Sequence, residues 1–237
     1  MVDILAFGIH PDDVELSCAG TLLKHMAAGY SVAIVDLSQG ELGTRGNGEL
    51  RLKEAAAAAK ILGVKYRDNL GLEDGFFRND RESQFKIIEK IREYRPKIVL
   101  CNAVSDRHPD HGRASQLVSE SCFYSGLSKI ETAYNKKVQE AYRPKAVYHY
   151  IQDRQLKPDF VIDITPFIDK KMEAILAYSS QFFDPNSQAP FTPISSPEFL
   201  ETVKAKMRVF GRDIFVEFAE GFTVERNMGV EDLMMLK

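Results

Sequence analysis

Short apolar segments and amphipathic segments alternate along most of this chain of 237 residues. Apolar runs that end in turn residues predict buried strands over residues 4–9, 31–37, 64–70, 97–103, 146–151 and 160–164. Apolar positions with helical spacing predict helices over residues 14–28, 50–62, 84–94, 111–124, 167–178 and 198–210. Strands that alternate with helices favour an α/β fold with a mostly parallel sheet and right-handed crossover connections.

The distribution of these elements predicts how the chain is organised. Residues 1–125 have the pattern of a Rossmann-like, doubly wound core, with helices on both faces of the sheet. Residues 126–237 add strands, helices and a loop rich in proline and phenylalanine over residues 180–198, and we expect residues 1–237 to form one domain. A loop of this length is typical of a functional segment or an interface. Whether it is a lid, an interface or both is left open, and a homo-oligomer is compatible with the sequence.

Composition and charge make some classes of protein and partner unlikely. The net charge is -3 and no lysine or arginine run is dense, which disfavours nucleic acid as a partner. No apolar run approaches the roughly 20 residues of a membrane span, and the first residues lack the pattern of a signal peptide. Cys18, Cys101 and Cys122 are widely spaced and odd in number, which indicates reduced core residues. We therefore expect a cytoplasmic protein whose partner is a small molecule.

Two short polar motifs resemble each other and follow two of the predicted strands. HPDD, residues 10–13, follows the first strand, and HPDH, residues 108–111, follows the fourth. In each motif the first and fourth residues share one face of a helical turn, and the proline suits the first helical position. In the strand order 3-2-1-4 that is usual for this fold class, the first and fourth strands are neighbours at the switch point, where ligands bind. The two motifs are therefore expected to face each other across one crevice.

Each motif has two interpretations, a helix cap or part of a metal site. Aspartate near a helix N-terminus is favoured by the helix dipole, so either motif alone is adequately explained as a cap. Two matching motifs at the switch point, which contain three of the five histidines, favour a metal site instead. Catalytic zinc takes three nitrogen or oxygen ligands and keeps one position open, and such a set also suits Fe(II) or Mn(II). His10 and Asp13 supply two ligands, and spacing leaves open whether His108 or His111 is the third.

The remaining polar residues of the motifs predict the catalytic groups. Asp12 is adjacent in sequence to a ligand, so its side chain points about 100° away around the helical turn. Its carboxylate would then lie beside the open metal position, as a general base for water. The histidine that does not bind metal is available to polarise a carbonyl or to protonate a leaving group. Asp110 is expected to fix the tautomer of that histidine, as carboxylates near metal sites do.

A glycine-rich segment, GELGTRGNG, follows the second predicted strand. It lacks the Lys-Ser/Thr pair of a phosphate-binding P-loop and follows the wrong strand for a dinucleotide fingerprint. A mobile active-site loop is favoured, with Arg45 and Arg51 as candidates for binding an anionic substrate group. The alternative is two surface arginines near the start of a helix. Nucleotide binding is also disfavoured because the first strand is followed by carboxylates, where a phosphate needs bare backbone amides.

The two motifs resemble those of the LmbE-like, or PIG-L, family of zinc-dependent N-acetylglucosamine deacetylases. In that family HPDD follows the first strand and HPDH follows the fourth, and both are unaltered here. The segments AGTLLKHMAAGY, LRLKEAAAAAKILG and FGRDIFVEFAEGF are similar to the family as well. Within the family the chain looks most similar to the branch of bacillithiol biosynthesis, which removes acetate from N-acetylglucosaminyl malate.

The resemblance implies a role for each motif residue. The implied zinc ligands are His10, Asp13 and His111. Asp12 is implied as the general base, His108 as the group that stabilises the oxyanion or acts as an acid, and Asp110 as its orienting partner. Arg51 resembles an arginine used for substrate binding. The alternatives are the same chemistry on another N-acetyl sugar or thiol-conjugate amide, and a non-catalytic metal- or sugar-binding protein.

Overall fold

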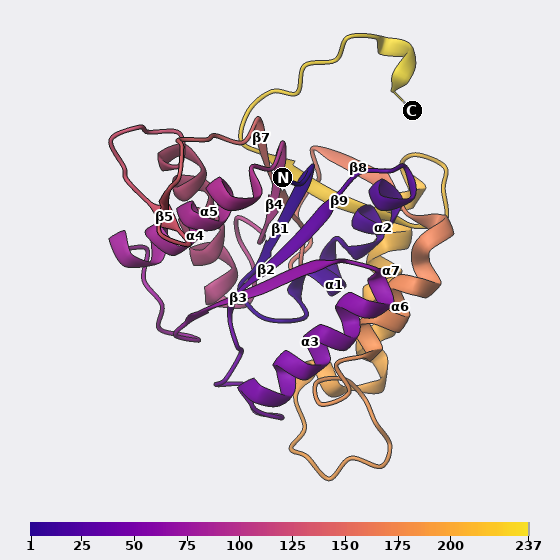
Figure 1. The fold of residues 1–237 in the computed structure, drawn as a ribbon. Helices are drawn as coiled ribbons and strands as arrows, with labels where there is room; N and C mark the ends of the chain where they lie inside the picture. The colour runs from indigo at the N-terminus through magenta and orange to yellow at the C-terminus, as the bar shows by residue number, and fades with distance from the viewer. Residues whose placement is uncertain (237) are drawn as a thin grey trace.

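A seven-stranded sheet with helices on both faces dominates the computed structural model, which describes residues 1–236 (Figure 1). The strands are β1 (Ile4–Gly8), β2 (Val32–Ser38), β3 (Tyr66–Leu72), β4 (Ile98–Cys101), β7 (Ala146–Tyr150), β8 (Phe160–Asp163) and β9 (Ala219–Val224). Their order across the sheet is β3-β2-β1-β4-β7-β9-β8. β9 pairs antiparallel with both β7 and β8, whereas the other pairs are parallel. The predicted fold class and the predicted order 3-2-1-4 are both confirmed.

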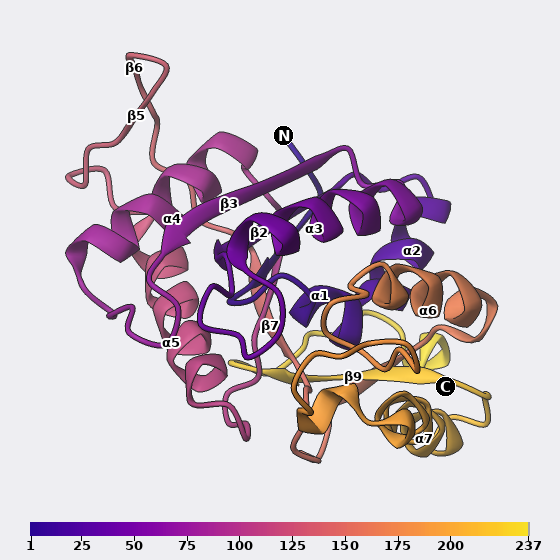
Figure 2. The ribbon, with the colours of Figure 1, turned by 90° about the horizontal axis from the view of Figure 1, so that it is seen from below.

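The helices form a layer on each face of the sheet. They are α1 (Asp13–Ser17), α2 (Ala19–Ala27), α3 (Gly48–Leu62), α4 (Arg81–Tyr94), α5 (Pro109–Tyr124), α6 (Ile168–Leu176) and α7 (Pro197–Arg212). Short 3-10 helices lie at η1 (Thr165–Phe167), η2 (Pro193–Ser195) and η3 (Leu233–Met235). Helices α4 and α5 lie on one side of the sheet, while α1, α2, α3 and α6 lie on the other (Figure 2). Helix α7 packs against β9.

The core lies on both faces of the central strand β1. Leu5 and Phe7 belong to the apolar cluster beneath α4 and α5, whereas Ile4 and Ala6 belong to the cluster beneath α1 and α2. Successive side chains of a strand point to opposite faces, so a strand covered on both sides must be apolar at every position. This explains the continuous apolar run that predicts β1.

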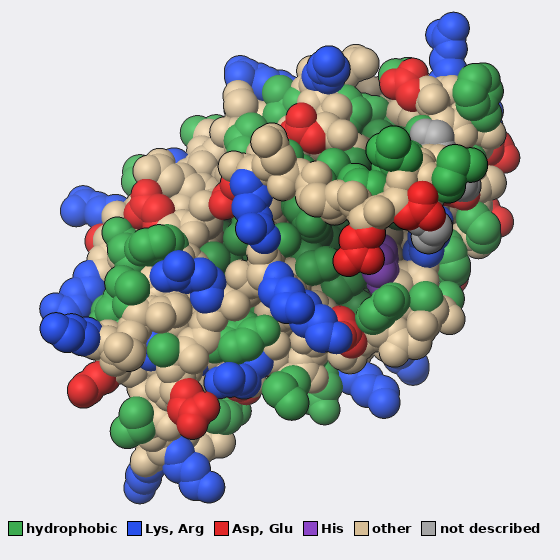
Figure 3. Space-filling view, turned by 90° about the horizontal axis from the view of Figure 1, so that it is seen from above, with side chains coloured by type: hydrophobic (Ala, Val, Ile, Leu, Met, Phe, Trp, Pro, Cys, Tyr) green, Lys and Arg blue, Asp and Glu red, His purple; other side chains and the backbone are tan. Residues whose placement is uncertain are grey.

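Charged and apolar side chains are mixed on one face of the molecule. Lysine and arginine side chains are scattered among acidic and apolar ones over the face seen from above (Figure 3). Within residues 1–236, no helix is both long enough and apolar enough to span a lipid bilayer.

The predicted helix over residues 14–28 is divided at Cys18 into α1 and α2. The Glu220 carboxylate, far away in sequence, accepts hydrogen bonds from the backbone nitrogens of Gly20 (2.9 Å) and Thr21 (2.7 Å). These groups at the start of α2 have no carbonyl partner within the helix, and a carboxylate satisfies them. The buried Glu220 carboxylate, which comes from β9, therefore binds the start of a second helix. Helical spacing alone did not predict this division into two helices.

Strand β9 and the small hairpin of β5 (Ala133–Tyr134) and β6 (Lys137–Val138) were not predicted either. β9 has the sequence AEGFTV, in which a glutamate and a glycine interrupt the apolar alternation. Glu220 is nevertheless buried, and a Cβ atom at Gly221 would lie only 3.0 Å from the Phe210 ring. Tertiary contacts therefore determine the residues of this strand.

Candidate metal-dependent active site

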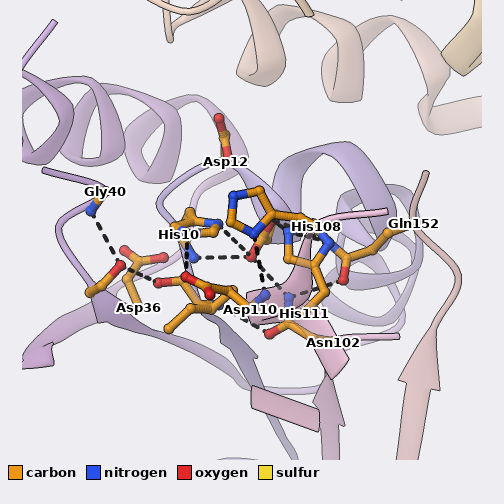
Figure 4. A network of polar contacts seen from close by, with 12 residues as sticks. His10, Asp12, Asp36, Gly40, Asn102, His108, Asp110, His111 and Gln152 are labelled. Atoms are coloured by element: carbon orange, nitrogen blue, oxygen red, sulfur yellow. Dashed lines mark hydrogen bonds and ion pairs between the residues drawn. The ribbon is translucent and has the colours of Figure 1, made fainter. Parts of the chain in front are cut away.

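The two polar motifs lie together at the carboxyl edge of the sheet (Figure 4). HPDD joins β1 to α1 and HPDH opens α5 after β4, and these two strands are paired neighbours. The centroid of the His10 ring lies 4.8 Å from that of His108 and 5.7 Å from that of His111. The prediction that the motifs face each other is confirmed.

The carboxylate of Asp13 lies between the two motifs. Its Oδ1 atom is 3.2 Å from Nε2 of His111, and its Oδ2 atom is 3.8 Å from Nδ1 of His10. Asn102 Nδ2 donates to Oδ2 at 2.9 Å, and Gln152 Nε2 donates to Oδ1 at 3.0 Å. Burial raises the pKa of Asp13, but the His111 and His10 imidazoles outweigh it and hold the pKa well below its usual range. An ionised carboxylate is the form that binds a metal.

Three further aspartates determine which ring nitrogens of His10 and His111 face this carboxylate. His10 Nε2 lies 2.9 Å from Asp74 Oδ1 and 3.4 Å from Asp110 Oδ2. His111 Nδ1 lies 2.6 Å from Asp106 Oδ2. Because a carboxylate accepts a hydrogen, these nitrogens are the ones that carry it, and the opposite nitrogens remain to bind a metal. Two imidazole nitrogens and one carboxylate therefore converge in a donor set that suits zinc.

The balance of charge around these residues also fits a cation. Burial lowers the pKa of His10, but hydrogen bonds to Asp110 and Asp74 outweigh it and raise the pKa to about 10. Burial likewise lowers the pKa of His111, but Asp13 and Asp106 raise it to about 9. Because carboxylates outnumber imidazoles here, the site has an excess of negative charge and stabilises positive charge. A divalent cation would neutralise this excess of negative charge.

His108 differs from the other two histidines in its hydrogen bonding. Its Nδ1 atom accepts the backbone N–H of Asp110 at 3.3 Å, so the neutral ring carries its hydrogen on Nε2. Burial and the nearby His10 imidazole lower the pKa of His108, which favours this neutral form. Ligand nitrogens of the three motif histidines lie within 4.8 Å of one another. A ring with Nε2–H beside two candidate ligands is suited to donate a hydrogen bond to a substrate.

The expected contact between the Asp110 carboxylate and His108 is wrong. This carboxylate lies against His10 instead, accepts the backbone N–H of Gly75 at 2.9 Å, and forms an ion pair with Arg113. Only the backbone nitrogen of Asp110 contacts the His108 ring. The reason is that the turn after β3 and Arg113 supply donors that draw the carboxylate toward the β1 side of the crevice.

Asp12 is buried but stands apart from this network. Figure 4 shows its side chain directed away from the hydrogen-bonded residues. The Arg51 guanidinium lies 3.9 Å from its Oδ2 atom. Burial raises the pKa of Asp12 to about 7, although the charge of Arg51 lowers it. Its backbone has a φ of 115°, a left-handed conformation that non-glycine residues rarely adopt and that is concentrated at functional sites.

Arg45 and Arg51 are both buried, so the alternative of two surface arginines is wrong. Arg45 donates to the Phe182 carbonyl at 3.1 Å and to Ser187 Oγ at 2.6 Å, and so holds the segment after α6. Arg51 contacts Gln181 Oε1 and approaches Asp12. Both arginines line the cavity over the site, with Arg51 nearer to the motifs.

This cavity has a volume of about 560 Å³. Its floor is formed by the two motifs, and its walls come from the 40–47 loop, the turn after β3, α3 and α7. The wall side chains include Leu42, Arg51, Phe76, Arg107, Phe199 and Met207. The volume is in the range of small-molecule binding sites.

Sequence reasoning missed several residues of the site, among them Asp74, Asn102, Asp106 and Gln152. Asn102 directly follows β4, and Gln152 follows β7 by two residues. A polar residue just beyond a parallel strand near the switch point is the signal that would have found these two. Asp106 lies two residues before HPDH, whereas Asp74 lies in a loop with no recognisable spacing.

The fold and site together define a hydrolase-type α/β enzyme whose candidate metal ligands lie at the switch point of a parallel sheet. A family model described as PIG-L, GlcNAc-PI de-N-acetylase, matches residues 5–122. The chain is 30% identical to the diacetylchitobiose deacetylase of Thermococcus kodakarensis, over 76% of this chain and 70% of that protein. It is 27% identical to a probable N-acetyl-alpha-D-glucosaminyl L-malate deacetylase 2 of Bacillus anthracis, over 73% of this chain and 78% of that protein.

A solved structure is similar to nearly the whole chain. The conserved protein TT1542 from Thermus thermophilus aligns with a TM-score of 0.86 and 36% identity, over 97% of each chain. The chain belongs to the PIG-L family. The prediction of a deacetylase-type hydrolase is confirmed at the level of this family.

Proposed function

We propose that this protein is a metal-dependent deacetylase that removes the acetyl group from an N-acetylglucosamine-containing substrate. The observation that carries the proposal is the convergence of His10, Asp13 and His111, next in sequence to the buried carboxylate of Asp12, which points away from their hydrogen-bond network (Figure 4). The family membership and the deacetylase relatives support the same reaction. Zinc is the metal that we propose, because two imidazoles and one carboxylate leave a coordination position open.

In the proposed mechanism different residues hold the metal, transfer the proton and bind the oxyanion. His10, Asp13 and His111 would hold zinc, which supplies a Lewis acid for the amide carbonyl and lowers the pKa of a water molecule. Asp12 accepts a proton from the attacking water. His108 donates a hydrogen bond from Nε2 to the developing oxyanion. The C–N bond breaks as Asp12 delivers the proton that it took from water to the leaving nitrogen, and the products are acetate and a free amine.

The substrate that we propose is N-acetylglucosaminyl malate. Arg51 and Arg107 both line the cavity, and their guanidinium groups suit the carboxylates of malate. The exposed ring of Phe76 on the same wall offers an apolar surface for a sugar ring. A neutral disaccharide such as diacetylchitobiose would offer these guanidinium groups no carboxylate from the substrate.

The proposal is tested by measuring acetate release from N-acetylglucosaminyl malate, N-acetylglucosamine and diacetylchitobiose, with metal analysis of the same sample. The expected result is bound zinc and the highest kcat/KM on the malate conjugate. A preference for diacetylchitobiose would overturn the substrate, and stoichiometric metal without acetate release from any N-acetyl sugar would overturn the reaction.

We also propose a cytoplasmic location. Cys18, Cys101 and Cys122 are buried and free. Unpaired buried thiols are typical of a reducing compartment, which supports the cytoplasm. Cell fractionation with an antibody against the protein tests this proposal.

A further inference from the structure

We infer that Gln152 is a positioning residue, whose side-chain amide holds the Asp13 carboxylate in the orientation that metal binding requires. The inference rests on the proposed function, because it assigns Asp13 to a metal. Gln152 lies two residues after β7, the strand next to β4 in the sheet. It belongs to the second half of the chain. The family model ends its match at residue 122.

The orientation of the Gln152 amide is determined by its partners. Its Oε1 atom accepts the backbone N–H of Ala103 at 3.1 Å and the Nδ2 hydrogen of Asn102 at 3.0 Å. Reversing the amide would place its donor group against these two donors. The Nε2 atom must therefore face the site, where it lies 3.0 Å from Asp13 Oδ1 and 3.4 Å from His111 Nε2.

Asn102 completes a chain of amides beneath the carboxylate. Its Oδ1 atom accepts the backbone N–H of Ile9 at 3.0 Å, so its Nδ2 atom is the donor to Asp13 Oδ2. Each carboxylate oxygen of Asp13 thus receives one side-chain amide hydrogen. Two donors, one on each oxygen, fix the rotation of the carboxylate, and hydrogen bonds of this kind are what orient carboxylates that bind metals.

The backbone around Gln152 is itself held from two directions. The N–H of Ile151 donates to the Gly221 carbonyl on β9 at 3.0 Å. Lys206 on α7 donates through Nζ to the carbonyls of Gln152 and Asp153. Strand β9 and helix α7 thereby fix the height of the amide above the sheet, which gives the second half of the chain a direct part in the metal site.

The test compares Gln152→Leu with Gln116→Leu, a control on the exposed surface of α5. Zinc affinity of the metal-free proteins is measured by competition with a chromogenic chelator, and folding by circular dichroism. Gln152→Leu should bind zinc about 10- to 100-fold more weakly, as found when partners of metal ligands are removed, and Gln116→Leu should match the wild type. A folded Gln152→Leu protein with wild-type zinc affinity would overturn the inference.

A second variant covers the case in which Gln152→Leu does not fold. Gln152→Glu retains the oxygen that accepts from Ala103 and Asn102, but it places a carboxylate oxygen beside Asp13. The Co(II)-loaded variant should show an altered visible absorption spectrum, and an unchanged spectrum together with unchanged zinc affinity would overturn the inference. These measurements use no substrate, so a failure to deacetylate N-acetyl sugars and a failure of this inference are separate results.

Discussion

Asp12 combines a strained backbone with a buried acid at one position. Its φ of 115° lies in the left-handed region, and burial raises the pKa of its carboxyl to about 7. Such strain costs on the order of 1–3 kcal/mol and persists only where surrounding structure enforces it. The HPDD turn therefore loses some stability at the residue that we propose as the general base.

Two substitutions at Asp12 separate the carboxylate from the backbone. Asp12→Ala and Asp12→Gly should both retain metal but lose turnover by about 10²- to 10⁴-fold, because both remove the proposed general base. Glycine adopts positive φ without strain, so Asp12→Gly should be more stable than Asp12→Ala by about 1 kcal/mol. Urea unfolding of the metal-free proteins measures the difference. Equal midpoints would show that the backbone is not strained.

Arg51 is predicted to set the pH dependence of the reaction through Asp12. Its charge lowers the pKa of Asp12, so Arg51→Met should raise that pKa. A base must be ionised to accept a proton, so the acid limb of the kcat/KM profile should move to higher pH in the variant. Lys53→Met, exposed on the same helix, is the control. An acid limb that stays in place or moves to lower pH contradicts the prediction.

The residues of the site differ in how well the sequence predicted them. HPDD and HPDH were recognised because ligand spacing within one helical turn is a local property of the sequence. Asp74, Asn102 and Gln152 were not, because each acts on a motif residue from another strand or loop. The wrong partner assigned to Asp110 has the same origin, since the turn at Gly75 that accommodates its carboxylate is remote in sequence.

At the scale of elements, a buried glutamate of α3, Glu54, binds the segment after α6. Glu54 accepts hydrogen bonds from Ser180 N and Ser180 Oγ, both at 2.7 Å, and from Ser179 Oγ at 3.2 Å. The neighbouring Gln181 contacts Arg51. The first residues of the predicted loop over residues 180–198 are thus attached to the site.

Removing this carboxylate should loosen the loop. In Glu54→Ala, cleavage by a protease within residues 183–192 should be about tenfold faster, because losing buried hydrogen bonds costs on the order of 1–3 kcal/mol. Mass spectrometry of limited digests locates and times the cut. Glu49→Ala, an exposed substitution on the same helix, should be cut at the wild-type rate. Equal rates for all three proteins would show that Glu54 does not hold the loop.

Elements were predictable where their apolar pattern was regular. The apolar runs of β1, β2 and β4 reflect burial on both faces of the sheet, a property visible in the residues themselves. The division between α1 and α2 and the strand β9 were not predictable, because both depend on the buried charge of Glu220. A buried acid reads as a surface residue until its partners are known.

For the whole molecule, the ion pair of Lys171 and Glu220 connects elements from both halves of the chain. The Lys171 Nζ atom lies 2.6 Å from Glu220 Oε1 and 2.9 Å from the Leu16 carbonyl, and both charged side chains are almost fully buried. The carboxylate also accepts from the first residues of α2. The pair thus joins α1, α2, α6 and β9 at one point.

Breaking this pair should destabilise the entire fold. Lys171→Met leaves the carboxylate buried without its cation, and we expect a loss of about 3–5 kcal/mol in the free energy of unfolding. Urea denaturation followed by circular dichroism measures it. The double variant Lys171→Met with Glu220→Gln should recover part of the loss, because it removes the unpaired charge. A single variant within about 1 kcal/mol of the wild type contradicts the prediction.

The position of β9 between β7 and β8 has a consequence for how the protein is made. A ribosome releases the chain from its amino end, so β1, β2, β3, β4 and β7 emerge in time to pair with one another. β8 cannot pair at this stage, because its neighbour in the sheet is β9. β9 begins some 56 residues after the end of β8. A message truncated before codon 219 would therefore encode both histidine motifs but leave the edges of β7 and β8 bare and open to aggregation. Quality control of this enzyme thus depends on a strand that is translated well after both histidine motifs.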